Sequence, residues 1–333
     1  MDSRKKLHFF LTDDEQKIGI LQFRPPGKLS EYPLPLILIH GFGQNHLTWT
    51  DDRRNGLADA LAEDGFEVFT VDMRGSGYSK PSKYNFTVDD LVEDLAKSVD
   101  YISKITSKEK FVLAGHSLGG TIAVRYTAGA NTSNVHALIL FGTPAIYGKG
   151  EPAMKIPGQF VRALSYFFGA TGIGGIVPLF WRRAYFLKIL GVFGIFGYPF
   201  MLSKNLLRFF PLYPAYPKNI GLGEFCEKVT KGFEVASPKV LIQVLRWAGE
   251  EKITSYDGKE NWTDMTRNIK CPTLIIAGRY DRLAPPYSIK PYLRLLSGEK
   301  KYVEFEAGHL DLVEGEFAKT KIKETVENFL LNL

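Results

Sequence analysis

Ser117 lies in the segment Gly115-His116-Ser117-Leu118-Gly119, which fits the pattern G-x-S-x-G. The apolar run 111–114 before it predicts a buried strand, and the apolar spacing after it predicts a helix. A serine on a tight strand-to-helix turn sits in a strained backbone, and glycines on either side let neighbouring segments approach. The helix N-terminus also favours developing negative charge. These features predict that Ser117 is a nucleophile.

A second segment, His40-Gly41-Phe42-Gly43, follows the buried apolar run 36–39. We expect its loop to present the backbone N–H of Phe42 beside that of Leu118, forming an oxyanion hole. One such donor stabilises a tetrahedral intermediate by ~3–4 kcal/mol. The alternative is an ordinary glycine-rich turn. We expect His40 to hold the loop rather than to carry a proton.

Asp281 and His309 each follow an apolar run that predicts a strand, 272–277 and 302–305 respectively. Serine attacks an ester near neutral pH only if an imidazole takes its proton and a carboxylate orients that imidazole. Because parallel strands place active groups at their carboxyl ends, we expect Ser117, Asp281 and His309 to act together.

Other residues compete for these roles. His116 adjoins the nucleophile but is expected to point away from it, and Asp311 lies within the same loop as His309. The segment 142–144, after the preceding strand, offers no carboxylate. The histidines without a matching context are His8, His46 and His136.

The elements that position these residues alternate between strand and helix. Strands are expected at 36–39, 68–71, 111–114, 137–141, 272–277 and 302–305. Helices are expected around 57–61, over 88–102 with a start signal at Thr87 and Asp90, after Ser117, and from 317 to the end. This order predicts an α/β fold with a mostly parallel sheet covered by helices on both faces.

The alternation stops between residues 146 and 265, where Gly, Phe, Tyr and Pro are abundant. We therefore predict an N-terminal core part at 1–145, a cap or lid at 146–265 and a C-terminal core part at 266–333. The insertion separates the sixth and seventh strands of the sheet.

Two long apolar runs lie in this insertion, Ala163–Trp181 and Ala184–Leu202. The first is long enough for a membrane span, but its five glycines and prolines make a poor continuous helix, which favours a lid. The aromatic residues either form the core of the cap or line an apolar acyl pocket and touch lipid. In the second hypothesis the residues facing head groups are Arg182, Arg183, Lys188, Lys204 and Arg208.

The composition is that of a folded globular protein, with 45% hydrophobic and 23% charged residues. The net charge of +6 mildly favours anionic surfaces, and no basic cluster interleaved with aromatics indicates nucleic-acid binding. Arg4-Lys5-Lys6 is interpreted as a solvated tail. Two cysteines and a short N-terminal apolar run interrupted by His8 predict a cytoplasmic protein, with peripheral membrane contact through the cap as a hypothesis.

With these motifs in order, the sequence resembles the α/β-hydrolase superfamily. The resemblance rests on HGFG, the stretch from Asp72 to Ser79, GHSLGG, CPTLIIAGRYDRLAPP and AGHLDLV. It implies that the Asp72 stretch is a structural loop. AGRYDRLAPP and AGHLDLV are similar to the polyhydroxyalkanoate synthase branch and its lipase-like relatives. Those polymerases carry cysteine where this chain has Ser117, which favours hydrolysis here.

We therefore expect a serine hydrolase that cleaves an ester or thioester with an apolar acyl group, without a metal or cofactor. An acyltransferase or polyhydroxyalkanoate-synthase-like enzyme with the same triad is the first alternative. Carbon–carbon bond hydrolysis and perhydrolysis use the same residues, and a non-catalytic ligand-binding protein is a further alternative.

Overall fold

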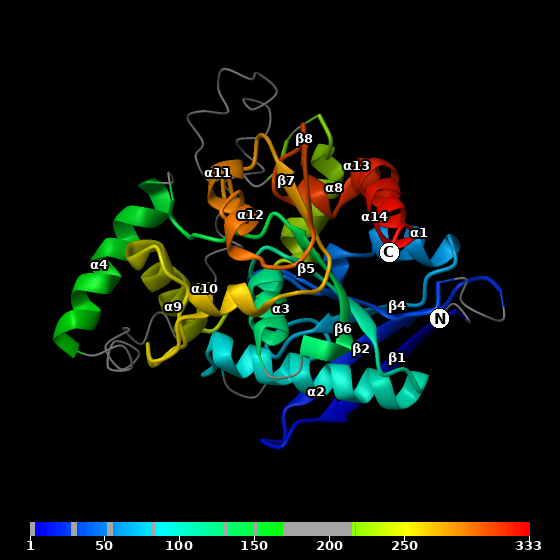
Figure 1. The fold of residues 1–333 in the computed structure, drawn as a ribbon, viewed down its shortest axis with the longest axis horizontal. Coiled ribbons are helices and arrows are strands. Elements are labelled where there is room, and N and C mark those ends of the chain that lie inside the picture. The colour runs from blue at the N-terminus through cyan, green and yellow to red at the C-terminus, as the bar shows by residue number, and fades with distance from the viewer. Residues whose placement is uncertain are drawn as a thin grey trace.

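The computed structural model describes residues 4–27, 32–51, 56–80, 84–129, 132–149, 152–168, 215–216 and 218–333. Eight strands form one sheet in the order β1-β2-β4-β3-β5-β6-β7-β8 (Figure 1). From β4 to β8 all neighbours pair in parallel, whereas β1 pairs with β2 and β2 with β4 antiparallel. The strands are β1 Lys5–Leu11, β2 Lys17–Phe23, β3 Leu36–Ile39, β4 Val68–Asp72, β5 Phe111–His116, β6 Val135–Phe141, β7 Thr273–Gly278 and β8 Lys300–Phe305.

Helices cover both faces of the sheet, as the sequence predicts. Alternate residues of one strand point to opposite faces, so Ile37 and Ile39 join a core with α2 and α3, and Leu36 and Leu38 join a core with α1 and α14. The α-helices are α1 Leu57–Glu63, α2 Val88–Thr106, α3 Leu118–Ala128, α4 Pro152–Phe168, α8 Leu222–Glu227, α9 Pro238–Glu250, α10 Trp262–Met265, α11 Pro286–Ile289, α12 Tyr292–Leu295, α13 Gly315–Phe317 and α14 Lys323–Leu330. Short 3₁₀ and π turns are η1 His46–Thr48, η2 Thr132–Asn134, η4 Lys228–Gly232, η5 Thr266–Asn268, η6 Leu310–Leu312 and η7 Ala318–Ile322.

The interpretation of Arg4-Lys5-Lys6 as a solvated tail is wrong. Lys5 and Lys6 open strand β1, whose register pairs Lys5 with Phe23. The Lys5 Nζ lies 2.6 Å from Asp59 Oδ1 and 4.7 Å from the centre of the Phe23 ring. The Lys5 ammonium group therefore pairs with a carboxylate and lies over an aromatic ring, and charged residues of this kind are common on edge strands.

Between β6 and β7 the described chain is helical. Helix α4 packs against α9 at a crossing so close that a methyl group on Gly158 would lie 2.5 Å from the Leu245 carbonyl oxygen. Helix α9 in turn places the fully buried Trp247 in the main core, against Tyr147 and Trp262. The division at 146 and 265 stays a prediction, and the basic residues from Arg182 to Arg208 lie outside the described residues.

No described helix combines the length and apolar character that crossing a membrane requires. Most of the run Ala163–Trp181, for which a span was considered, lies outside the described residues.

Candidate active site

Ser117 occupies the turn between β5, which ends at His116, and α3, which begins at Leu118. Its φ of 54° and ψ of −120° are unusual for a residue with a side chain, and the surrounding packing must hold them. The Ser117 N–H donates to the Phe141 carbonyl at 2.9 Å, which joins the turn to the end of β6. The turn packs closely on the neighbouring loop, since a methyl group on Gly119 would lie 2.4 Å from the His40 carbonyl oxygen.

Asp281 and His309 form a direct hydrogen bond from the loops that follow β7 and β8. His309 Nδ1 lies 2.6 Å from Asp281 Oδ2, and both side chains are buried. The other carboxylate oxygen, Oδ1, accepts from the backbone N–H of Leu283 at 2.8 Å and of Ala284 at 2.7 Å. With Oδ1 engaged, Oδ2 is left for the Nδ1–H of the imidazole. That tautomer leaves Nε2 as a proton acceptor.

The three predicted residues lie at the same edge of the sheet. A methyl group on Gly142, the residue after Phe141, would lie 3.1 Å from His309 Nδ1 and 3.2 Å from Asp281 Oδ2. The rings of His116 and His309 lie 4.5 Å apart, so the imidazole sits beside the residue that precedes Ser117. Within the described ranges no hydrogen bond joins Ser117 Oγ to His309. Such catalytic hydrogen bonds often tighten only when substrate is bound.

The loop after β3 lies against this turn, because a methyl group on Gly41 would lie 3.2 Å from Ser117 Cβ. The Gln44 side chain stabilises this loop, because its oxygen accepts a hydrogen bond from the Gly41 N–H at 2.9 Å. In the described part of the chain, neither the Phe42 N–H nor the Leu118 N–H donates a hydrogen bond. Two unengaged donors beside Ser117 are what the expected oxyanion hole would require.

His40 holds this loop, as its sequence position suggests. Its Nε2 accepts from the Met73 N–H at 3.1 Å, so Nδ1 carries the proton and donates to the Gly41 carbonyl at 2.9 Å. Burial lowers the pKa of His40 below its usual value, more than the nearby Asp72 raises it. Both ring nitrogens of this neutral imidazole are engaged in hydrogen bonds to the backbone, which fits a structural role.

The Asp72 stretch is a structural loop in the described structure. The buried Asp72 carboxylate accepts from the backbone N–H of His46 at 2.7 Å and of Tyr78 at 2.8 Å, and its Oδ2 lies 2.8 Å from His46 Nδ1. His46, for which no role was predicted, pairs with Asp72, and its ring stacks on that of Tyr78 with the centres 4.5 Å apart.

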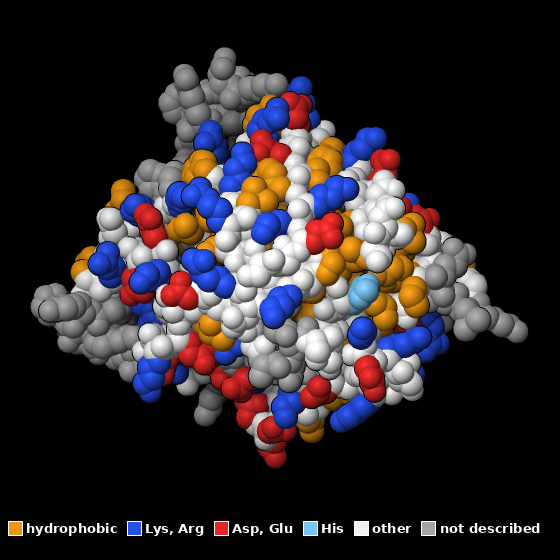
Figure 2. Space-filling model, in the orientation of Figure 1, with side chains coloured by type: hydrophobic (Ala, Val, Ile, Leu, Met, Phe, Trp, Pro, Cys, Tyr) orange, Lys and Arg blue, Asp and Glu red, His pale blue; other side chains and the backbone are white. Residues whose placement is uncertain are grey.

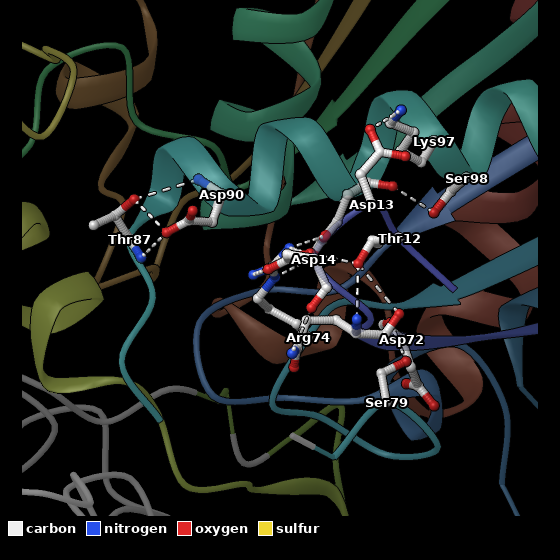
Figure 3. Close-up of polar contacts among 12 residues, drawn as sticks. Thr12, Asp13, Asp14, Asp72, Arg74, Ser79, Thr87, Asp90, Lys97 and Ser98 are labelled. Carbon is white, nitrogen blue, oxygen red and sulfur yellow. Dashed lines mark hydrogen bonds and ion pairs between the residues drawn. The ribbon is translucent and has the colours of Figure 1, made fainter. Parts of the chain in front are cut away.

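Arg74 anchors the same stretch to the rest of the core (Figure 3). Its guanidinium binds both Asp94 oxygens at 2.6 Å and both Asp14 oxygens at 2.8 and 3.2 Å. Burial opposes the charge, but the two carboxylates together raise the pKa of Arg74. These bidentate ion pairs hold the stretch from Asp72 to Ser79 in place, next to the segment His40–Gly43.

Two buried residues position the His309 loop, and sequence reasoning missed both roles. His116 Nε2 lies 3.1 Å from the His309 carbonyl oxygen. Asp311 accepts from the Gly308 N–H at 2.7 Å and from Asn219 Nδ2 at 3.1 Å, and it makes no hydrogen bond to the His309 ring among the described residues. Burial raises the pKa of Asp311 to about 6, although these hydrogen bonds act to lower it. The AGHLDLV motif marks Asp311, but its partner at 219 lies outside the motif.

A cavity of about 400 Å³ lies beside Asp281. Tyr216 and Tyr280 stack in its wall with ring centres 4.5 Å apart, and Pro285, Pro286 and Tyr287 extend the lining. A second cavity, bounded by Phe42, Leu118 and Val240, has about 30 Å³ and is too small for an acyl chain.

In the described ranges no group of three or more His, Cys, Asp or Glu side chains is placed to hold a metal ion.

Comparison with known proteins agrees with this architecture. A family model for the alpha/beta hydrolase fold matches residues 35–172. The chain is 24% identical over 348 residues to a probable lipase of Schizosaccharomyces pombe, covering 94% of this chain and 72% of that protein. It is 23% identical over 322 residues to a poly(3-hydroxyalkanoate) polymerase subunit of Haloferax mediterranei, covering 90% of this chain and 58% of that protein. An esterase structure from Exiguobacterium antarcticum is similar with a TM-score of 0.62 at 19% identity, covering 97% of this chain and 98% of the other, which shows the shared fold.

Proposed function

We propose that the chain is a serine hydrolase of the α/β-hydrolase superfamily that cleaves carboxylic esters or thioesters with an apolar acyl group, on the likeness of residues 35–172 to that fold and of the chain to a probable lipase. The observation that carries this proposal is the Asp281–His309 hydrogen bond of 2.6 Å, made from the one Asp281 oxygen that the backbone leaves available. The likeness to a probable lipase supports an apolar substrate, and so does the wall of tyrosines and prolines in the cavity beside Asp281, although Arg279, Arg282 and Glu304 also line that cavity.

In the proposed reaction, His309 Nε2 takes the proton of Ser117 while Ser117 Oγ attacks the substrate carbonyl carbon. Asp281 keeps the imidazole in the required tautomer and stabilises its charged form. The N–H groups of Phe42 and Leu118 donate to the oxyanion of the tetrahedral intermediate. His309 then protonates the leaving alcohol or thiol. Water, deprotonated by His309, hydrolyses the acyl-enzyme and restores Ser117.

Ser117→Ala tests this chemistry. We expect kcat to fall by a factor of about 10⁴ or more, with labelling by a fluorophosphonate probe abolished. Ser133→Ala, on the exposed face of η2, is the matched control and is expected to keep both. Undiminished ester cleavage by the Ser117 variant would remove this residue from the mechanism.

A series of p-nitrophenyl esters of increasing chain length, with and without detergent, tests the substrate class. We expect kcat/KM to rise with acyl length because longer chains bury more apolar surface. A preference for acetate would contradict the apolar acyl group without touching the triad.

Acyl transfer is the second candidate, favoured by the likeness to a polymerase subunit. The acyl-enzyme is the same, but an alcohol or thiol replaces water. Product analysis with such an acceptor present distinguishes the two, because a transferase yields mainly the new ester or thioester and a hydrolase yields the free acid.

A further inference from the structure

Helix α4 presents two large apolar side chains to solvent, one helical turn apart. Ile156 is 66% exposed and Phe160 is 67% exposed, and Ala163 continues the same face. The opposite face is occupied, because Gly158 packs against the backbone of α9. Helix α4 also stands at the edge of the molecule, away from the sheet (Figure 1). Exposed apolar side chains along one face of a packed helix indicate a binding surface.

The distribution of charged residues along the sequence indicates which kind of partner α4 would bind. From residue 152 to 223 the sequence contains no aspartate or glutamate, and the rest of the chain holds 34 of the 42 basic residues against all 36 acidic ones. The net positive charge of the protein therefore belongs to this one segment. Its basic residues are Lys155, Arg162, Arg182, Arg183, Lys188, Lys204, Arg208 and Lys218.

Two of these cations lie on α4 itself. Arg162 is exposed next to Phe160, and Lys155 forms an ion pair with Glu251, the residue that follows α9. Figure 2 shows further lysines and arginines gathered near α10 and α12, on the side of the molecule that carries α4. An apolar helix face with cations at its flanks is the pattern of helices that lie in an anionic lipid interface.

We propose that α4 docks this protein on an anionic lipid surface, with Ile156 and Phe160 entering the acyl boundary and Arg162 facing the head groups. A second copy of the chain fits this surface less well. A symmetric contact through α4 would bring two Arg162 side chains together, and like charges repel. The proposal concerns binding alone and does not depend on the chemistry at Ser117.

Vesicle co-flotation of the full chain tests the proposal, with Ser117→Ala in every variant so that catalysis does not alter the lipid. We expect binding to vesicles of phosphatidylcholine with phosphatidylglycerol, weaker binding at high salt, and little binding to phosphatidylcholine alone. The Ile156→Ser and Phe160→Ser double variant is expected to bind at least about tenfold more weakly. Arg162→Gln is expected to bind about fivefold more weakly.

Matched controls come from the opposite side of the molecule. Leu331→Ser changes a C-terminal residue that is 68% exposed, and Lys104→Gln changes an exposed cation on α2. Both are expected to bind as the parent does. Thermal unfolding verifies that each variant is folded.

Three results would overturn the proposal: no flotation with anionic vesicles, equal loss in the Leu331 variant, or undiminished binding by the α4 double variant. A dimer in sedimentation equilibrium without lipid, dissociated by the α4 substitutions, would assign the surface to a second copy. Esterase activity is measured separately on soluble substrates, so failure of the proposed chemistry leaves the docking result interpretable.

Discussion

Asp311 accepts hydrogen bonds from the backbone N–H of Tyr216, which lies 2.9 Å from Oδ1 and 3.1 Å from Oδ2. The same carboxylate holds the Gly308 N–H, one residue before His309. It therefore ties the segment that precedes α8 to the loop of the proposed general base. Tyr216 also stacks on Tyr280, the neighbour of Asp281, so one contact supports both loops.

Asp311→Asn should lower both stability and kcat. Among the described residues, every hydrogen-bond partner of this carboxylate is an N–H donor, so the new amide would set a donor against a donor in a buried site. We expect a loss of about 1–3 kcal/mol in the free energy of unfolding and a fall in kcat of about tenfold, with KM changed less. Denaturant titration and steady-state kinetics measure these. Asp100→Asn, on the exposed side of α2, is the control and should change neither.

Gly142→Ala should impair catalysis more than it impairs folding. Gly142 has a φ of +52°, and the added methyl would press on His309 Nδ1 and Asp281 Oδ2. We expect a stability cost of about 1–2 kcal/mol from the left-handed backbone and a fall in kcat on the order of 10- to 100-fold.

Gly258→Ala separates these two effects, because its φ is +78° and nothing lies within 4 Å of the added methyl. Gly258→Ala should therefore lower only the free energy of unfolding, through the left-handed backbone, and leave kcat unchanged. If both variants keep the parent kcat, the spacing at Gly142 does not matter to the reaction.

Lys228 and Glu314 form a buried ion pair with Nζ and Oε1 2.5 Å apart. Replacing one partner leaves an uncompensated charge, so Lys228→Met and Glu314→Leu should each lower the free energy of unfolding by about 3–5 kcal/mol. The double variant should lie near the parent. Denaturant titration of all four proteins gives the coupling energy, and additive losses would mean that the pair does not act as a unit.

The pH dependence of stability should report the same carboxyl group. Burial raises the pKa of Glu314 to about 7, more than Lys228 lowers it. The folded chain then holds a proton that the unfolded chain releases near pH 4.5, so stability from this group is present at low pH and lost as pH rises to 7.

The difference in free energy of unfolding between the parent and Glu314→Gln should therefore fall by on the order of 3 kcal/mol between pH 5 and pH 8. Titrating groups remote from Glu314 are common to both proteins and cancel in the difference, whereas its partner Lys228 is part of the effect. A difference that stays constant over this range would show that Glu314 is ionised throughout.

Local patterns in the sequence were enough to predict most of the fold. Six apolar runs became the strands from β3 to β8, and Thr87 with Asp90 caps α2 where the start signal stands. These predictions succeeded because a buried strand or an amphipathic helix leaves its period in neighbouring residues. Strand β1 was not predicted because an edge strand with exposed lysines has no clear apolar run. Strand β2 lies inside the sheet and buries Ile18, Ile20 and Leu21, and it was not predicted either.

The proposal of Ser117, Asp281 and His309 as a triad also came from the sequence, because each has the residue type that its proposed role needs and each follows a predicted strand. Only the tertiary structure decided what holds them. Asp311 meets Tyr216 across 95 residues, and His116 meets the His309 carbonyl across 193. No periodicity encodes such contacts, because they depend on the directions in which separate loops leave the sheet. The exposed stripe on α4 was also decided by folding, since only packing against α9 determined which face stayed in water.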